Sequence, residues 1–233
     1  MKVLLKRAAV VIAVGLLGGL LGVSTAMAST ISECAAGSFG PAPGNTILPV
    51  DCTGSDSGTL LASLSSPFSY TTTAGTNTGF INSAVYDDGG TLDFYYQLVN
   101  DPGSSTALAR TSETSFVGFT TNAAFVTNGG SLGTLFQDGN TLPTSVDSNF
   151  NGSVIGFNFN QTVANEIAPG SSSFVLIIST NATSYTMGNA SVIDGGTATV
   201  AAFQPAASVP EPASLALLGF GLIGLAGFRR FRR

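Results

Sequence analysis

The chain has no histidine and no tryptophan, and only 9% of its 233 residues are charged. Without histidine it cannot build a Ser-His-Asp or Cys-His nucleophile. Its only lysines, Lys2 and Lys6, precede a long apolar run, so the rest of the chain has no lysine for a Schiff base or a general base. Catalysis would have to come from carboxylates alone, as in glycosidases. We therefore expect no enzyme activity. A hydrolase that uses carboxylates alone remains an alternative, ranked below the structural and ligand-binding roles given at the end of this section.

The carboxylates available for such chemistry have a simpler explanation. Most of them stand beside glycine, asparagine or proline, which is typical of turn-forming aspartates. The candidates are Asp87, Asp88, Asp93, Asp101, Glu113, Asp138, Asp147 and Glu166.

Cysteine is also scarce, with Cys34 and Cys52 as the only two. Two thiols without a histidine are too few ligands for a zinc site. The apolar N-terminus described below is an export signal, and an oxidising compartment favours pairing. We predict a Cys34–Cys52 disulfide, which would stabilise the fold by about 3 kcal/mol on the chain-entropy model.

One acidic stretch could bind a hard cation. Asp87 and Asp88 precede Gly89-Gly90, and Asp93 follows within seven residues of Asp87. Carboxylate oxygens suit Ca²⁺, although the spacing is not that of an EF-hand loop. A hairpin turn is the alternative. We expect no other cofactor.

The N-terminus has the three parts of an export signal. Positive charges end at Arg7, residues 8–23 are apolar or glycine, and small residues at Ala26 and Ala28 form a cleavage site. We therefore assign residues 1–28 to a helical signal peptide that is threaded by the export machinery and removed by signal peptidase after Ala28.

The C-terminus ends in a second apolar stretch. Residues 213–228 would span about 24 Å as a helix, short of the roughly 30 Å hydrocarbon core. We predict a transmembrane helix here, followed by a basic cytoplasmic tail at 229–233 in accordance with the positive-inside rule. The arginines that stop the helix are Arg229, Arg230, Arg232 and Arg233.

A short stiff segment precedes this helix. Residues 205–212 form a linker that ends in Val209-Pro210-Glu211-Pro212, where proline enforces an extended, non-helical backbone. Together with the apolar stretch and the terminal arginines, this segment resembles the PEP-CTERM protein-sorting signal of Gram-negative bacteria. The resemblance covers about 25 residues. It implies an exosortase as partner and an exported protein held in the inner membrane as a precursor, then located at the cell surface or outside, commonly in organisms that make exopolysaccharide and biofilm.

The body between the two signals is strongly acidic. Of the 13 acidic residues only Glu211 lies outside residues 29–208, whereas of the 8 basic residues only Arg110 lies inside. The formal charge of this body is therefore −11 (1 minus 12). Such a charge repels nucleic acid, which excludes that class of partner.

The body has the pattern of an all-β protein. Apolar and polar residues alternate in short runs separated by Gly-, Asn- and Asp-rich turns, and residues 174–178 are apolar on both faces, as in a central strand. We predict an antiparallel β-sandwich over 59–204, after an irregular N-terminal lobe at 29–58. The expected strands are 59–64, 68–73, 80–86, 91–98, 114–121, 131–136, 154–160, 174–178 and 197–203, with a short helix at 163–167.

These observations favour a structural or adhesive role for an exported protein, linked to extracellular polysaccharide. The alternative is a carbohydrate- or calcium-binding module. With no tryptophan, a sugar-binding platform would have to use tyrosine, and Tyr95 is the candidate because it alternates with Phe94 and Tyr96 and could face solvent.

The predicted disulfide can be tested on the exported protein. We expect neither cysteine to react with iodoacetamide until a reductant is added, because Cys34 and Cys52 are the only thiols and should be paired. Mass spectrometry with and without reductant measures this. Two alkylated cysteines in the unreduced exported protein would contradict the prediction.

Overall fold

A computed structural model describes residues 44–54, 58–133, 135–159 and 165–206. The elements are, in chain order, β1 (Thr46–Ile47), β2 (Val50–Asp51), β3 (Thr59–Thr72), β4 (Gly75–Asp88), β5 (Thr91–Asn100), β6 (Arg110–Thr114), β7 (Thr121–Val126), the 3₁₀ turn η1 (Gly129–Leu132), β8 (Ser145–Ser148), β9 (Val154–Asn158), β10 (Val175–Thr180), β11 (Tyr185–Ile193) and β12 (Thr197–Pro205).

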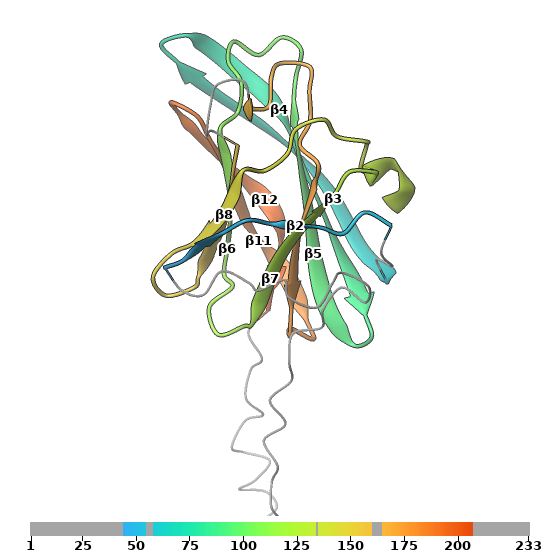
Figure 1. The fold of residues 1–233 in the computed structure, drawn as a ribbon. Helices are drawn as coiled ribbons and strands as arrows, with labels where there is room; N and C mark the ends of the chain where they lie inside the picture. The colour runs from blue at the N-terminus through green and yellow to red at the C-terminus, as the bar shows by residue number, and fades with distance from the viewer. Residues whose placement is uncertain (1–43, 55–57, 134, 160–164, 207–233) are drawn as a thin grey trace, which may run out of the picture.

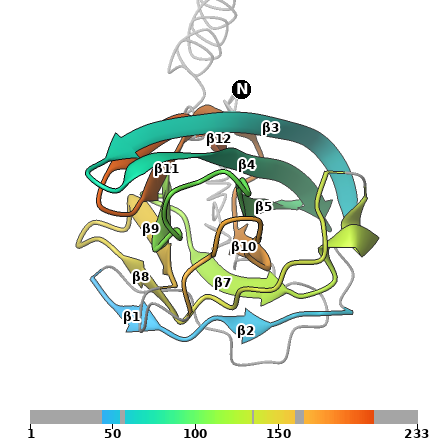
Figure 2. The same ribbon diagram turned by 90° about the horizontal axis from the view of Figure 1, so that it is seen from above.

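The strands form two six-stranded sheets that face each other (Figures 1 and 2). One sheet has the order β1-β8-β9-β6-β11-β12, here called sheet A, and the other has the order β2-β7-β10-β5-β4-β3, here called sheet B. Neighbouring strands are antiparallel except for β2 and β7, which pair in parallel. The all-β prediction is confirmed, and the parallel pair makes sheet B mixed.

The main core lies between the sheets. Phe94, Tyr96 and Leu98 from β5 pack with Ile155 and Phe157 from β9 in one buried cluster. Tyr96 also donates a hydrogen bond across the core to the Phe203 carbonyl at 2.6 Å. Because alternate strand residues point to opposite faces, the odd-numbered residues of β5 point to the other side of sheet B.

That other side carries a second core. Tyr95, Ile177 and Phe136 are buried there with Cys52, and Val50 of β2 and Leu135 pack against the same cluster. β5 and β10 are therefore covered on both faces, which confirms the expectation of a central strand at 174–178. Tyr95 is only 1% exposed, so the expectation that it could face solvent was wrong. The alternation within a strand does not show whether other segments cover its outer face, and here they do.

β1 and β2 close one side of the sandwich. They lie only three residues apart, yet β1 pairs with β8 in sheet A and β2 pairs with β7 in sheet B. Residues 44–54, expected in an irregular lobe, thus contribute one edge strand to each sheet.

The opposite side is formed by β3 and β12. Ser66 of β3 donates a hydrogen bond to the Ala201 carbonyl of β12 at 2.7 Å. The sequence suggested two strands on either side of Pro67, but β3 runs unbroken from Thr59 to Thr72. An edge strand tolerates proline because its missing N–H can face away from the sheet.

Other expected elements differ from the observed ones. The strand predicted at 114–121 is instead a loop between β6 and β7, where Ser115 and Gly118 have φ of 72° and 86°. Residues 131–136 begin in η1 and continue without a strand. Strands β6, β7, β8 and β11 were not predicted, since their content of small and polar residues hides the alternation. The short helix expected at 163–167 falls mainly outside the described residues.

In the part of the chain that the structure describes, no helix is long and apolar enough to cross a lipid bilayer. The predicted signal helix at 1–28 and transmembrane helix at 213–228 lie outside the described residues.

Candidate functional site

Most of the residues singled out from the sequence lie outside the described part of the chain. These are the cleavage residues Ala26 and Ala28, the cysteine Cys34, the sorting residues Val209, Pro210, Glu211 and Pro212, and the arginines Arg229, Arg230, Arg232 and Arg233. Cys52 is described and is 2% exposed. Its pairing with Cys34 stays a prediction.

The acidic stretch proposed for calcium forms the β4–β5 hairpin. Asp87 accepts a hydrogen bond from the Gly90 amide at 2.7 Å, and Gly89 and Gly90 both have positive φ, as a tight turn requires. Across the described ranges, no three Asp, Glu, Cys or His side chains converge where a metal ion could bind. Asp87 therefore has the turn-forming role, and calcium binding stays a prediction.

Asp93 lies outside this turn, and its side chain is buried on the side of sheet B that carries the second core. It is 1% exposed and lies beside Ser179 of β10 in register. The Ser179 hydroxyl is the nearby polar side chain that acts on its carboxyl group. Burial raises the pKa of Asp93 to about 7, the Ser179 hydroxyl partly offsets this, and the Asp88 carboxylate raises the pKa further.

Glu113 of β6 is a second buried carboxyl, located in the main core. It is 1% exposed, and one of its oxygens accepts a hydrogen bond from the Thr111 hydroxyl at 2.7 Å. Burial raises the pKa of Glu113 to about 8, although Thr111 and Arg110 act in the opposite direction. A carboxyl buried without a full set of partners binds a proton because its charged form is poorly solvated.

The two buried carboxyls cannot work as a catalytic pair. Glu113 faces the space between the sheets, whereas Asp93 shares the outer face of sheet B with Tyr95. The β5 backbone separates them. A glycosidase needs its two carboxyls on either side of one bond, within about 10 Å in an open cleft, so this pair does not provide that geometry.

Arg110 is the one basic residue of the acidic body, and it is neutralised on the outer face of sheet A. Its guanidinium forms an ion pair with Asp147, and Asn158 donates a hydrogen bond to the same carboxylate at 2.6 Å. Gly156 leaves room for the guanidinium, because an added Cβ would overlap it. Arg110 therefore has a structural partner.

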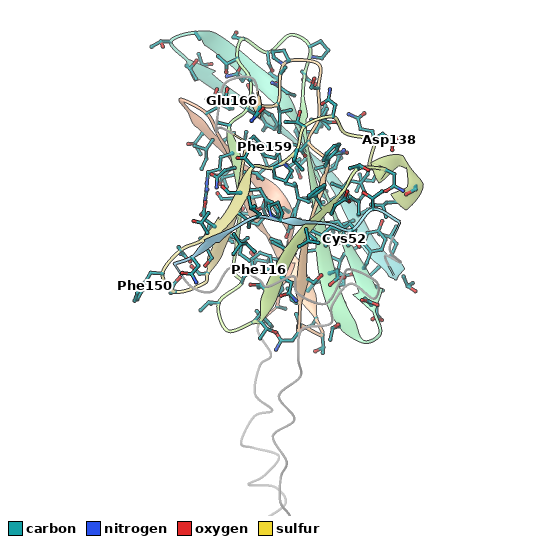
Figure 3. All side chains as sticks on the ribbon, viewed as in Figure 1. Cys52, Phe116, Asp138, Phe150, Phe159 and Glu166 are labelled. Atoms are coloured by element: carbon teal, nitrogen blue, oxygen red, sulfur yellow. The ribbon has the colours of Figure 1, made fainter. Side chains whose placement is uncertain are left out.

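One end of the sandwich, here called the base, is where β12 ends. It comprises the β6–β7 loop (115–120), the β8–β9 turn (149–153), the start of β11 (184–187) and the last described residues (204–206). β12 ends at the bottom of Figure 1, and Figure 3 shows Phe150 protruding near this end. A cavity of about 660 Å³ opens between these segments, lined by Val117, Phe119, Val154 and Pro205 with several hydroxyl side chains.

The opposite end, here called the distal end, is more polar. A cavity of about 240 Å³ is lined there by Asn140, Thr141, Thr144, Asn165 and Glu166, with one apolar residue, Leu142. Figure 3 shows Glu166 at the end opposite to Phe150. Amide and hydroxyl groups of this kind donate and accept hydrogen bonds, as a neutral polar ligand requires.

Sequence reasoning did not find either cavity. The base depends on three loops that are distant in sequence, and no motif connects them. Ser115 is the one non-glycine residue with positive φ among the described residues, and it lies within 114–121, which the sequence predicts as a strand. A usable signal was present, since these loops lack charged residues.

The comparisons with known proteins concern the segment directly after β12. Residues 208–233 match the family model of the PEP-CTERM protein-sorting motif. This confirms the resemblance noted from the sequence, and it implies an exported protein that is processed by exosortase. Neither a curated protein nor a solved structure matches the chain.

The two buried carboxyls predict an unusual pH dependence of stability. Asp93 and Glu113 bind protons more tightly when folded (pKa about 7 and about 8) than at their ordinary values of 3.8 and 4.5. Their contribution is fully present below about pH 4 and is lost as the pH rises to about 8. We expect the unfolding free energy to fall by a few kcal/mol between pH 5 and 8.

Denaturant titrations between pH 4 and 9 measure this decline. Glu113→Gln and Asp93→Asn mimic the protonated forms, and each should reduce the decline of the unfolding free energy between pH 5 and 8. Asp147→Asn is the control, because Arg110 lowers the pKa of Asp147 and its contribution is lost only as the pH falls below about 4. A wild-type profile that is flat from pH 5 to 8 would contradict the prediction.

Proposed function

We propose that this chain is an exported structural or adhesive protein, without enzyme activity, whose β-sandwich is delivered to the cell surface or extracellular matrix by its C-terminal sorting signal. The observation that carries this proposal is the match at 208–233, which begins directly after β12 ends at Pro205. The signal is thus appended to the last strand of the body.

The proposed route has two stages. The precursor is held in the inner membrane by the apolar segment 213–228, with the sandwich outside and the terminal arginines on the cytoplasmic side. Exosortase then acts near Pro210-Glu211-Pro212, and the sandwich leaves the membrane. The signal peptide at 1–28 and the Cys34–Cys52 disulfide belong to the same proposal, because both suit an exported protein.

The proposed ligand class is a neutral polysaccharide. A body with a charge of −11 repels acidic polymers, so a neutral polymer is the better partner. The polar distal cavity supports this choice, because its amides and hydroxyls can hydrogen-bond to sugar hydroxyls. Tyr95 is buried and is not proposed to contact sugar.

The sorting step is tested by Glu211→Ala in the native host. We expect the variant to stay in the inner membrane at full length, because the enzyme would lose the single charged residue between the two prolines. Cell fractionation and immunoblotting measure the distribution and size of the protein. Glu166→Ala, the same change within the sandwich, should be processed like wild type. Normal release of the Glu211 variant would disprove the proposed route.

Binding to extracellular polymer is tested by co-sedimentation of the released protein with polysaccharide purified from the host. We expect wild type to sediment with the polymer, and Asn165→Ala in the distal cavity to raise the apparent Kd by about tenfold, equivalent to about 1.4 kcal/mol. Asn151→Ala, the same change in the β8–β9 turn, is the control. If wild type remains in the supernatant, or both variants bind like wild type, polysaccharide binding at the distal end is disproved.

A further inference from the structure

Large apolar side chains protrude from the base of the sandwich. Phe150 at the tip of the β8–β9 turn is 91% exposed, Val117 in the β6–β7 loop is 56% exposed, and Met187 of β11 is 51% exposed. Figure 3 shows Phe150 pointing away from the body. Isolated exposed apolar residues are ordinary, but several that gather at one end of a domain mark a contact surface.

The base cavity lies beside part of this group. Val117 lines the cavity, together with Ser153, three residues from Phe150, and Thr186 of β11. Met187, the neighbour of Thr186, pairs with Phe203 and points to the other face of β11. Nearby, Tyr185 is 37% exposed and packs edge-to-face on Phe203 at 5.6 Å between ring centroids. Gln204, Pro205 and Ala206 form the remaining wall, so the chain leaves the body at the cavity itself.

This surface lacks charge in an otherwise acidic body. Residues 115–120, 149–153, 184–187 and 204–206 include no Asp, Glu, Lys or Arg. Two acidic residues in the strands that lead into these loops add little charge at neutral pH, because Asp147 is paired with Arg110 and burial raises the pKa of Glu113 to about 8. At the same end, Asp87 and Asp88 lie on the β4–β5 hairpin of sheet B, so the uncharged surface belongs to the sheet A side.

The length of chain beyond Ala206 limits where this surface can be. Only six residues, 207–212, separate Ala206 from the apolar segment 213–228, and six extended residues reach about 20 Å. Within the proposed function, on which this inference rests, the segment 213–228 lies in the bilayer. The base is therefore held within about 20 Å of the membrane surface for as long as the precursor is uncut.

We propose that the base of sheet A is a lipid-contact surface, which lays the sandwich against the bilayer interface before processing. Phe150, Val117 and Met187 insert among the lipid headgroups, as apolar side chains of interfacial proteins do. The acidic β4–β5 hairpin is turned away, so the sandwich leans toward sheet A. This posture holds Ala206, where the described chain leaves the body, close to the membrane surface and within reach of a membrane-embedded enzyme.

The absence of tryptophan makes a direct test possible. The exported precursor, residues 29–233, is prepared as Phe150→Trp and reconstituted into phosphatidylcholine vesicles with or without bromine on the acyl chains. We expect bromine to quench the single tryptophan by about twofold or more, because the side chain lies at the headgroup–acyl boundary. Leu142→Trp is the matched control at the distal end, where Leu142 is 48% exposed, and it should not be quenched.

Vesicle flotation separates the possible failures. If the precursor does not float with the vesicles, the anchoring step of the proposed function is wrong. If it floats and tryptophan at position 150 is quenched no more than tryptophan at position 142, the lipid-contact surface is disproved while the anchor stands. If the fluorescence of tryptophan at position 150 changes only after exosortase is added to the vesicles, the surface contacts the enzyme and not the lipid. This result would also overturn the proposal.

Discussion

The fold depends on covering both faces of the two central strands, β5 and β10. Phe94 and Tyr96 of β5 fill the space between the sheets, while Tyr95 and Ile177 need cover on the other side of sheet B. That cover comes from β2 and from the segment around Phe136. In the described part of the body no α-helix covers this face, so loops and short strands form the second layer and pack closely on the sheet.

The sequence predicted the strands whose apolar content is high or alternates clearly. β4, β5 and β12 alternate, and β10 is apolar on both faces, so their patterns could be recognised. β8 (Ser-Val-Asp-Ser) is too short and polar to stand out, and in β11 the exposed residues include Tyr185 and Met187, so exposed and buried positions do not differ in polarity. At the candidate sites the limit was different: the base and the distal cavity each unite segments that are distant along the chain, and a single sequence carries no signal for such proximity.

The body has almost no ion pairs available to it, because it contains only one basic residue. Arg110 is the one cation of the body, and it lies on the outer face of sheet A with Asp147 and Asn158. Among the other described acidic residues, Asp87 lies in a tight turn and accepts a hydrogen bond from its own loop, whereas Glu113 is buried with its pKa raised to about 8. The body therefore owes its cohesion to apolar packing and backbone hydrogen bonds, which salt screens little, and this suits a protein exposed to uncontrolled ionic conditions.

β3, the long strand at the border of sheet B, has a consequence for crowding. Proteins displayed at high density on a surface risk joining strand to strand through unpaired backbone groups. Here Pro67 removes one backbone donor near the middle of this strand. The Ser66 hydroxyl donates a hydrogen bond to the Ala201 carbonyl, which holds β12 beside this border. A border with a missing donor is a poorer template for a second strand, which lowers the risk that copies of the exported protein join strand to strand.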